Sequence, residues 1–164
     1  MTVSCILFDF GGTLAREDFL LSAPDDCPHW SAAIKETLFA EPKTLLDPWM
    51  EGRISALEVA ETVAKSTGLS TRRTQQVFVE NCKNLIFFND VRRYAADARR
   101  GGIRTAIVTL NADIFLDVIV PHYDLNSEHD LIVCSSEFGT LDKTTLCLVA
   151  VDGLGFEKNR TKFS

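Results

Sequence analysis

The stretch Ile6–Leu14, ILFDFGGTL, decides the fold that we expect for this chain. It continues an almost unbroken apolar run, Val3–Phe8, and a run of this kind bounded by glycines is typical of a strand buried on both faces of a parallel sheet. Asp9 follows at the carboxyl end of the run, and Gly11 and Gly12 then allow a tight turn. Because ligands bind beyond the carboxyl ends of such strands, Asp9 is a candidate nucleophile or metal ligand. The alternative is an aspartate that only caps the turn.

This strand and the residues D-x-x-G-T-L that follow resemble the first motif of the haloacid dehalogenase (HAD) superfamily. In that family the first aspartate is the nucleophile and forms an aspartyl-phosphate or aspartyl-ester intermediate, and Asp9 matches it. The resemblance also implies that Asp9 and the backbone carbonyl of Gly11 bind Mg²⁺, and that Gly12 belongs to the substrate-binding loop. Phosphatases of the family usually carry a second aspartate, a general acid and base, at the position that Gly11 occupies here.

Two later segments carry polar residues at positions that match further motifs of the HAD superfamily. Ile103–Val108 is a predicted strand that ends in Thr109 and Asn111, whose hydroxyl and amide groups can bind a phosphoryl group. The run IRTAIVTLN resembles the second family motif, which implies that both residues bind the transferring group. The order S-S-E-x-G-x-x-x-K, ending in Lys143, resembles the third motif, where a lysine balances the charge of the carboxylate. The alternative is a surface lysine at the start of a helix.

Residues 15–89 contain no strand-like run, and their apolar residues recur at helical spacing. Ser55 and Glu58 form the sequence pattern of a capping box, which predicts a helix start. The resembled family inserts an α-helical cap at this point, which covers the active site and selects the substrate. We therefore expect a HAD-like core of residues 1–14 and 90–164 and a helical cap of residues 15–89. The alternative is a helical hairpin with no gating role.

The composition is that of a globular protein, with 46% hydrophobic residues, 24% charged residues and a net charge of −6. No basic stripe is present, which argues against nucleic acid as a partner. No apolar run approaches the roughly 18 residues that cross a bilayer, so no membrane partner is expected. The N-terminus lacks the pattern of a signal peptide. Five cysteines at irregular spacings favour free thiols in a reducing compartment, so we expect a cytoplasmic protein.

The expected fold class is α/β, a Rossmann-like core of three layers with a parallel sheet and an inserted helical cap. The resemblance is to the helical-cap subgroup, but residues 153–164 are polar and offer no counterpart of the fourth family motif, an acidic pair after a further strand that binds Mg²⁺. We therefore expect a C-terminally truncated member whose last core strand or strands are missing. The run Val3–Phe8 would then form a sheet edge open to self-association.

The leading hypothesis is a HAD-like hydrolase that cleaves a small phosphorylated substrate through an aspartyl-phosphate on Asp9. Two negative charges about 4 Å apart repel by roughly 4 kcal/mol at an effective dielectric constant of about 20, so the charges of Lys143 and of the implied Mg²⁺ matter. Two alternatives remain. One is a non-catalytic truncated protein that binds a phosphoryl ligand or a partner. The other is a 2-haloacid dehalogenase, which shares the nucleophile Asp9 and needs no metal but favours an aromatic residue where this chain has Gly11.

Overall fold

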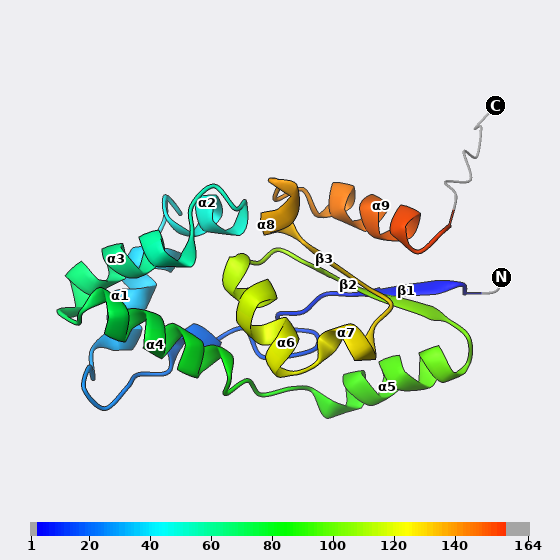
Figure 1. The fold of residues 1–164 in the computed structure, drawn as a ribbon, viewed down its shortest axis with the longest axis horizontal. Helices are drawn as coiled ribbons and strands as arrows, with labels where there is room; N and C mark the ends of the chain where they lie inside the picture. The colour runs from blue at the N-terminus through cyan, green and yellow to red at the C-terminus, as the bar shows by residue number, and fades with distance from the viewer. Residues whose placement is uncertain (1–2, 157–164) are drawn as a thin grey trace.

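The computed structural model describes residues 3–156 (Figure 1). Within them the sheet has three parallel strands in the order β1 (Cys5–Phe8), β2 (Arg104–Thr109) and β3 (Leu131–Cys134). The central strand β2 is buried at every position except its first residue, Arg104. Because all three strands run in the same direction, their carboxyl ends meet at one end of the sheet.

Helices cover both faces of this sheet. Helix α5 (Asn89–Arg100) packs against β2 on one face, and α9 (Lys143–Gly153) packs against β2 and β3 on the other, as Figure 1 shows. The α9 face buries a small cluster that includes Val108, Val133 and Leu146. This arrangement confirms the predicted α/β, Rossmann-like architecture of three layers around a parallel sheet.

Short and long helices occupy the chain between β1 and α5, on the side of the molecule beyond the carboxyl ends of the strands (Figure 1). They are η1 (Phe19–Leu21), α1 (Trp30–Ile34), the π-helical turn η2 (Lys35–Phe39), α2 (Leu46–Met50), α3 (Ala56–Thr67) and α4 (Thr71–Cys82). The capping box at the start of α3 is confirmed, because Ser55 Oγ accepts from Glu58 N at 3.3 Å and Glu58 Oε2 accepts from Ser55 N at 2.7 Å.

The chain between β2 and α9 contains four short helical segments. They are the π-helical turn η3 (Phe115–Ile119), α6 (Val120–His122), α7 (Leu125–Glu128) and α8 (Ser135–Phe138). Pro121 does not end the helical structure, because it lies in the first turn of α6, where a missing N–H is tolerated. The single helical turn α8 follows β3 directly. None of the helices in residues 3–156 is long and apolar enough to cross a membrane.

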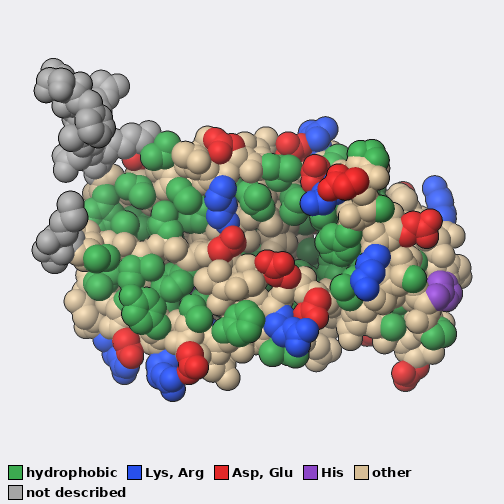
Figure 2. Space-filling model, turned by 180° about the vertical axis from the view of Figure 1, so that it is seen from behind, with side chains coloured by type: hydrophobic (Ala, Val, Ile, Leu, Met, Phe, Trp, Pro, Cys, Tyr) green, Lys and Arg blue, Asp and Glu red, His purple; other side chains and the backbone are tan. Residues whose placement is uncertain are grey.

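Strand β1 is less buried than its apolar sequence predicted. Only Phe8 is buried, whereas Cys5, Ile6 and Leu7 are half-buried. The reason is its position, since β1 is an edge strand and pairs only with β2 within residues 3–156. Figure 2 shows hydrophobic side chains gathered on the half of the molecule that carries β1 and α9. Self-association through this edge stays a prediction.

The segment 15–89 joins the rest of the chain through both apolar and polar contacts. One hydrophobic cluster runs from the strand ends into the helices of this segment, and it contains Phe10, Trp49 and Phe78. The two ends of the segment lie side by side, because Arg16 N donates to the carbonyl of Ile86 at 2.9 Å. The division into a core and a cap stays a prediction.

Asp113 anchors two helices of the predicted cap. Its Oδ1 accepts a hydrogen bond from Trp49 Nε1 in α2 at 2.6 Å, and its Oδ2 accepts one from Ala56 N in α3 at 2.9 Å. Nearby, Ser135 Oγ donates to the carbonyl of Met50 at 2.7 Å. These bonds hold α2 and α3 beside the carboxyl ends of the strands.

We expect Asp113→Ala to lower the free energy of unfolding by about 1–3 kcal/mol, because the buried indole N–H of Trp49 would lose its acceptor. Urea denaturation followed by tryptophan fluorescence measures the change. Asp117→Ala, which removes an exposed carboxylate from η3, is the matched control and should have little effect. An unfolding midpoint equal to that of the wild type for Asp113→Ala would contradict the anchoring role.

Candidate active site

A cavity of about 440 Å³ lies at the carboxyl ends of β1 and β2, beneath the helices η1 and α2. The residues that line it include Asp9, Gly11, Thr109, Asn111 and Lys143. The structure therefore brings together five of the six residues that the sequence motifs singled out, from segments more than 130 positions apart. Its place beyond the carboxyl ends of parallel strands is where ligands bind in open α/β sheets.

An ion pair between Lys143 and Asp9 forms the charged floor of the cavity. Lys143 Nζ lies 2.9 Å from Asp9 Oδ1, and it also donates to the carbonyl of Val108 at 2.6 Å. Asp9 Oδ1 accepts a further hydrogen bond from Phe10 N at 2.8 Å. The Asp9 side chain is 46% exposed and the Lys143 side chain 35%, so both groups remain accessible from the cavity. In this structure Lys143 is a partner of the carboxylate, and the alternative of a solvated surface lysine does not describe it.

The N-terminal end of α9 holds Lys143 in this position. Asp142 is the N-cap of the helix, and its carboxylate accepts hydrogen bonds from the backbone N–H groups of Thr144 and Thr145 at 3.1 and 3.3 Å. Such caps satisfy N–H groups that have no partner within the helix. Lys143 is the first residue after the cap, so the helix start fixes the backbone from which its side chain reaches Asp9.

The polar groups at the end of β2 are positioned by β3 and by the loop itself. Thr109 is the last residue of β2 and is buried. The Asn111 loop is held by Ser135, whose Oγ accepts from Asn111 N at 2.9 Å and donates to the carbonyl of Asn111 at 3.0 Å. Asn111 Oδ1 accepts from Ala112 N at 3.0 Å, so the amide nitrogen is the part of this side chain that can serve a substrate.

Gly12 is the predicted site residue that does not line the cavity. It forms the tight turn after β1, with φ +73° and a hydrogen bond from its N–H to the carbonyl of Ala15 at 2.8 Å. A positive φ of this size is readily adopted by glycine, which explains the residue type at this position. Its contribution to substrate binding stays a prediction.

Glu17 lines the cavity and was missed by the sequence motifs. A Cβ atom on residue 11 would stand 3.2 Å from Glu17 Cγ, and one on residue 12 would stand 2.6 Å from Glu17 Oε1. The glutamate side chain therefore occupies the space next to Asp9 that a side chain at position 11 would need. Nothing in the local sequence indicates this role, because Glu17 reaches the site only through the turn at Gly11 and Gly12.

The described side chains do not form a complete metal site. Within residues 3–156 no group of three or more His, Cys, Asp or Glu side chains could hold a metal ion. The two donors that the HAD resemblance implies are the Asp9 carboxylate and the Gly11 carbonyl, and Asp9 Oδ1 is already paired with Lys143. This donor set does not fit Mg²⁺ by itself.

Two of the cysteines, Cys82 and Cys134, are unsuited to nucleophilic catalysis. All five are free, and Cys82 and Cys134 are buried. Burial raises the pKa of the Cys82 thiol to about 12, and it also raises the pKa of Cys134. Because the thiolate is the reactive form, these two thiols stay protonated and inert at neutral pH.

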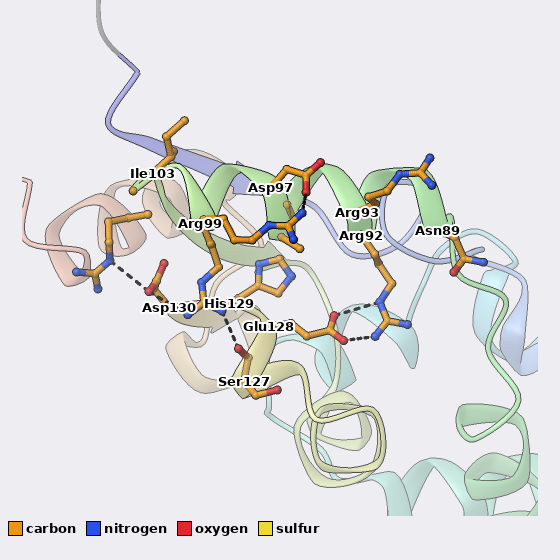
Figure 3. A pocket seen from close by; sticks show the side chains of 15 residues that line it. Asn89, Arg92, Arg93, Asp97, Arg99, Ile103, Ser127, Glu128, His129 and Asp130 are labelled. Atoms are coloured by element: carbon orange, nitrogen blue, oxygen red, sulfur yellow. Dashed lines mark hydrogen bonds and ion pairs between the residues drawn. The ribbon is translucent and has the colours of Figure 1, made fainter.

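A larger cavity, of about 830 Å³, lies elsewhere, between α5 and residues 127–130 (Figure 3). Its arginines are paired with carboxylates, Arg92 with Glu128 and Arg99 with Asp130. The cavity adjoins the amino ends of β2 and β3, so it lies at the opposite end of the strands from Asp9. Paired surface charges of this kind are a common solvated arrangement, so we do not place the active site there.

No protein-family model matches the sequence, and no curated protein matches it significantly. Solved structures do match the fold. A predicted HAD-like family hydrolase from Porphyromonas gingivalis is 17% identical with a TM-score of 0.66, and the match covers 96% of this chain and 78% of that one. A HAD family enzyme from Bacteroides thetaiotaomicron, in complex with magnesium and inorganic phosphate, is 13% identical with a TM-score of 0.65, over 94% and 80% of the two chains.

A third similar structure is the L-2-haloacid dehalogenase from Xanthobacter autotrophicus with chloropropionic acid covalently bound. It is 13% identical with a TM-score of 0.59, and the match covers 95% of this chain and 66% of that one. At these identities the likeness shows the fold alone. The chain therefore has the fold of the haloacid dehalogenase-like hydrolases, as its motifs predicted.

Proposed function

We propose that the chain hydrolyses phosphate monoesters through a covalent intermediate on Asp9. The observation that carries this proposal is the Asp9–Lys143 ion pair at the carboxyl ends of parallel strands, in a cavity that Thr109 and Asn111 also line. A nucleophilic carboxylate next to a cation and hydrogen-bond donors is the set of groups that phosphoryl transfer needs. The Bacteroides enzyme with this fold, which was solved with magnesium and phosphate, supports the phosphatase chemistry.

The reaction proceeds in two displacements at phosphorus. In the first, a carboxylate oxygen of Asp9 forms a bond to phosphorus while the bond to the leaving alcohol oxygen breaks. In the second, water attacks the phosphorus of the aspartyl-phosphate, which releases phosphate and restores Asp9. Glu17, the other carboxyl group on the cavity wall among the described residues, is assigned proton transfer to the leaving oxygen and from the water.

Lys143 supplies the charge balance that the described residues can offer. The approach of an anionic ester to Asp9 costs roughly 4 kcal/mol at about 4 Å and an effective dielectric constant of about 20. The Lys143 ammonium, 2.9 Å from Asp9 Oδ1, offsets that repulsion, and Thr109 and Asn111 can donate to the phosphoryl oxygens. The binding of Mg²⁺ stays a proposal that rests on the family resemblance.

We also propose a cytoplasmic location, because all five cysteines are free thiols, which persist in a reducing compartment.

Asp9→Asn should lower phosphatase turnover by at least about a thousandfold, because the amide keeps the size of the side chain but removes the nucleophilic charge. Release of phosphate from a generic ester is the measurement, in protein free of contaminating phosphatase. Asp25→Asn alters an exposed carboxylate outside the cavity and should leave turnover unchanged. Equal turnover by the wild type and Asp9→Asn would refute the assignment of the nucleophile.

Lys143→Ala should weaken the binding of inorganic phosphate by roughly 10- to 100-fold at low salt, as expected when a charged hydrogen-bond donor is lost. The difference should shrink as salt rises, because the side chain is 35% exposed and its charge is screened. Calorimetric titration at two ionic strengths measures both effects, and Lys65→Ala on the exposed side of α3 is the control. An unchanged dissociation constant at low salt would show that Lys143 has no part in binding.

A 2-haloacid dehalogenase is the second candidate. It shares the nucleophile Asp9 and needs no second aspartate at position 11, although dehalogenases favour an aromatic residue where this chain has Gly11. In this reaction Asp9 would attack the carbon that bears the halogen, halide would leave, and water would cleave the resulting ester. The similarity to the Xanthobacter dehalogenase supports the same chemistry.

One experiment separates these two candidates from a non-catalytic protein. The chain is incubated with a phosphate monoester or with 2-chloropropionate, each with and without added magnesium, and phosphate and chloride release are measured. We expect release of phosphate rather than chloride, and the paired samples show whether added magnesium changes its rate. Chloride release without metal would assign the dehalogenase function, and release of neither product would leave a protein that binds a phosphoryl ligand or a partner.

A further inference from the structure

We propose that the cavity above Asp9 selects phosphate monoesters of hydrocarbon alcohols. This inference rests on the proposed function, because it names the substrate class of the same site. It follows from what faces the charged floor of the cavity. That floor holds Asp9, Thr109, Asn111 and Lys143, and the opposite wall comes from the segment 15–89.

The opposite wall is made almost entirely of hydrocarbon. Its apolar side chains come from η1, from the end of η2 and from α2, and they are Phe19, Leu20, Phe39, Leu46, Trp49 and Met50. Leu20 and Trp49 are buried and belong to the core, so their positions are fixed by packing. Phe39 is 39% exposed. Figure 2 shows a hollow near the middle of the molecule with hydrophobic side chains inside it and charged side chains around it.

This wall offers a substrate no hydrogen-bond donor among the described side chains that line the cavity from residues 15–89. The indole N–H of Trp49 is the one donor that its side chains carry, and it is bound to Asp113 Oδ1 at 2.6 Å. Glu17 is the other polar side chain of the wall, and its carboxyl group, which is assigned to proton transfer at the leaving oxygen, is the one acceptor that the wall offers. A substrate body rich in hydroxyl groups would therefore lose more hydrogen bonds with water than this wall can replace.

An apolar substrate binds more tightly in such a cavity, because its hydrocarbon surface leaves water without losing hydrogen bonds. Each methylene group that leaves water for such a wall strengthens binding by roughly fourfold. The volume of about 440 Å³ lies in the lower part of the usual range for ligand sites, roughly 300–1,000 Å³, and it leaves room for several carbon atoms beside the phosphoryl group. An alkyl or aryl alcohol of moderate size fits these constraints.

Binding of alkylphosphonates tests the inference without requiring turnover, since their carbon–phosphorus bond is not hydrolysed as an ester. We expect n-hexylphosphonate to bind at least about tenfold more tightly than methylphosphonate in calorimetric titration. Phe39→Ser should reduce this ratio because it removes a ring from the wall. Phe88→Ser, an exposed aromatic residue that does not line the cavity, is the matched control and should keep the ratio. Equal binding of the two phosphonates by the wild type would overturn the inference.

Turnover gives the second test, with esters of primary alcohols so that the leaving groups are similar. We expect kcat/KM for n-hexyl phosphate to exceed that for glucose 6-phosphate by at least about tenfold. Equal or higher kcat/KM for glucose 6-phosphate would overturn the substrate class while the phosphatase function stands. Tight binding of n-hexylphosphonate with no hydrolysis of any ester would support the apolar selectivity and overturn the proposed function.

Discussion

The contact between Lys143 and Asp9 is the interaction on which the rest of the site depends. Through one ammonium group it joins three parts of the chain, since Lys143 begins α9, hydrogen-bonds to Val108 in β2 and pairs with Asp9 just after β1. The same contact therefore fixes the start of α9 over the sheet and compensates the charge of the candidate nucleophile. The Asp9 side chain is still 46% exposed beside this cation, so a substrate in the cavity can reach it.

The second constraint is the position of the helices above that pair. Asp113 binds α2 through Trp49 and α3 through Ala56, so a single carboxylate beyond β2 holds the roof of the cavity. It also uses the only polar atom of the Trp49 side chain, which leaves an apolar surface facing Asp9. The hydrogen bond between Asp113 and Trp49 thus anchors α2 and also removes the one donor that the apolar wall would otherwise offer.

Much of this arrangement could be predicted from the sequence because it depends on local patterns. Asp9 and Thr109 each follow an apolar run, and parallel strands bring such positions to one end of a sheet. Lys143 was found by its spacing after Ser135 and Ser136. The capping box at Ser55 is likewise a contact between near neighbours in the chain. These features need no knowledge of how distant segments pack.

The features that the sequence did not reveal depend on long-range packing. Asp113 hydrogen-bonds to Ala56 and Trp49, which lie 57 and 64 positions earlier in the chain. No local pattern distinguishes it from an ordinary surface carboxylate. Glu17 reaches the cavity because two glycines let the chain fold back beside Asp9. The partial burial of β1 also follows from its place at the edge of the described sheet, although its composition is that of an interior strand.

The stereochemical outcome at phosphorus tests the central claim most directly. An ester made chiral at phosphorus with oxygen isotopes is hydrolysed, and the configuration of the released phosphate is determined. Two successive displacements, first by Asp9 and then by water, each invert the configuration, so our account predicts overall retention. Overall inversion would show that water attacks the ester directly, and it would contradict the covalent role of Asp9.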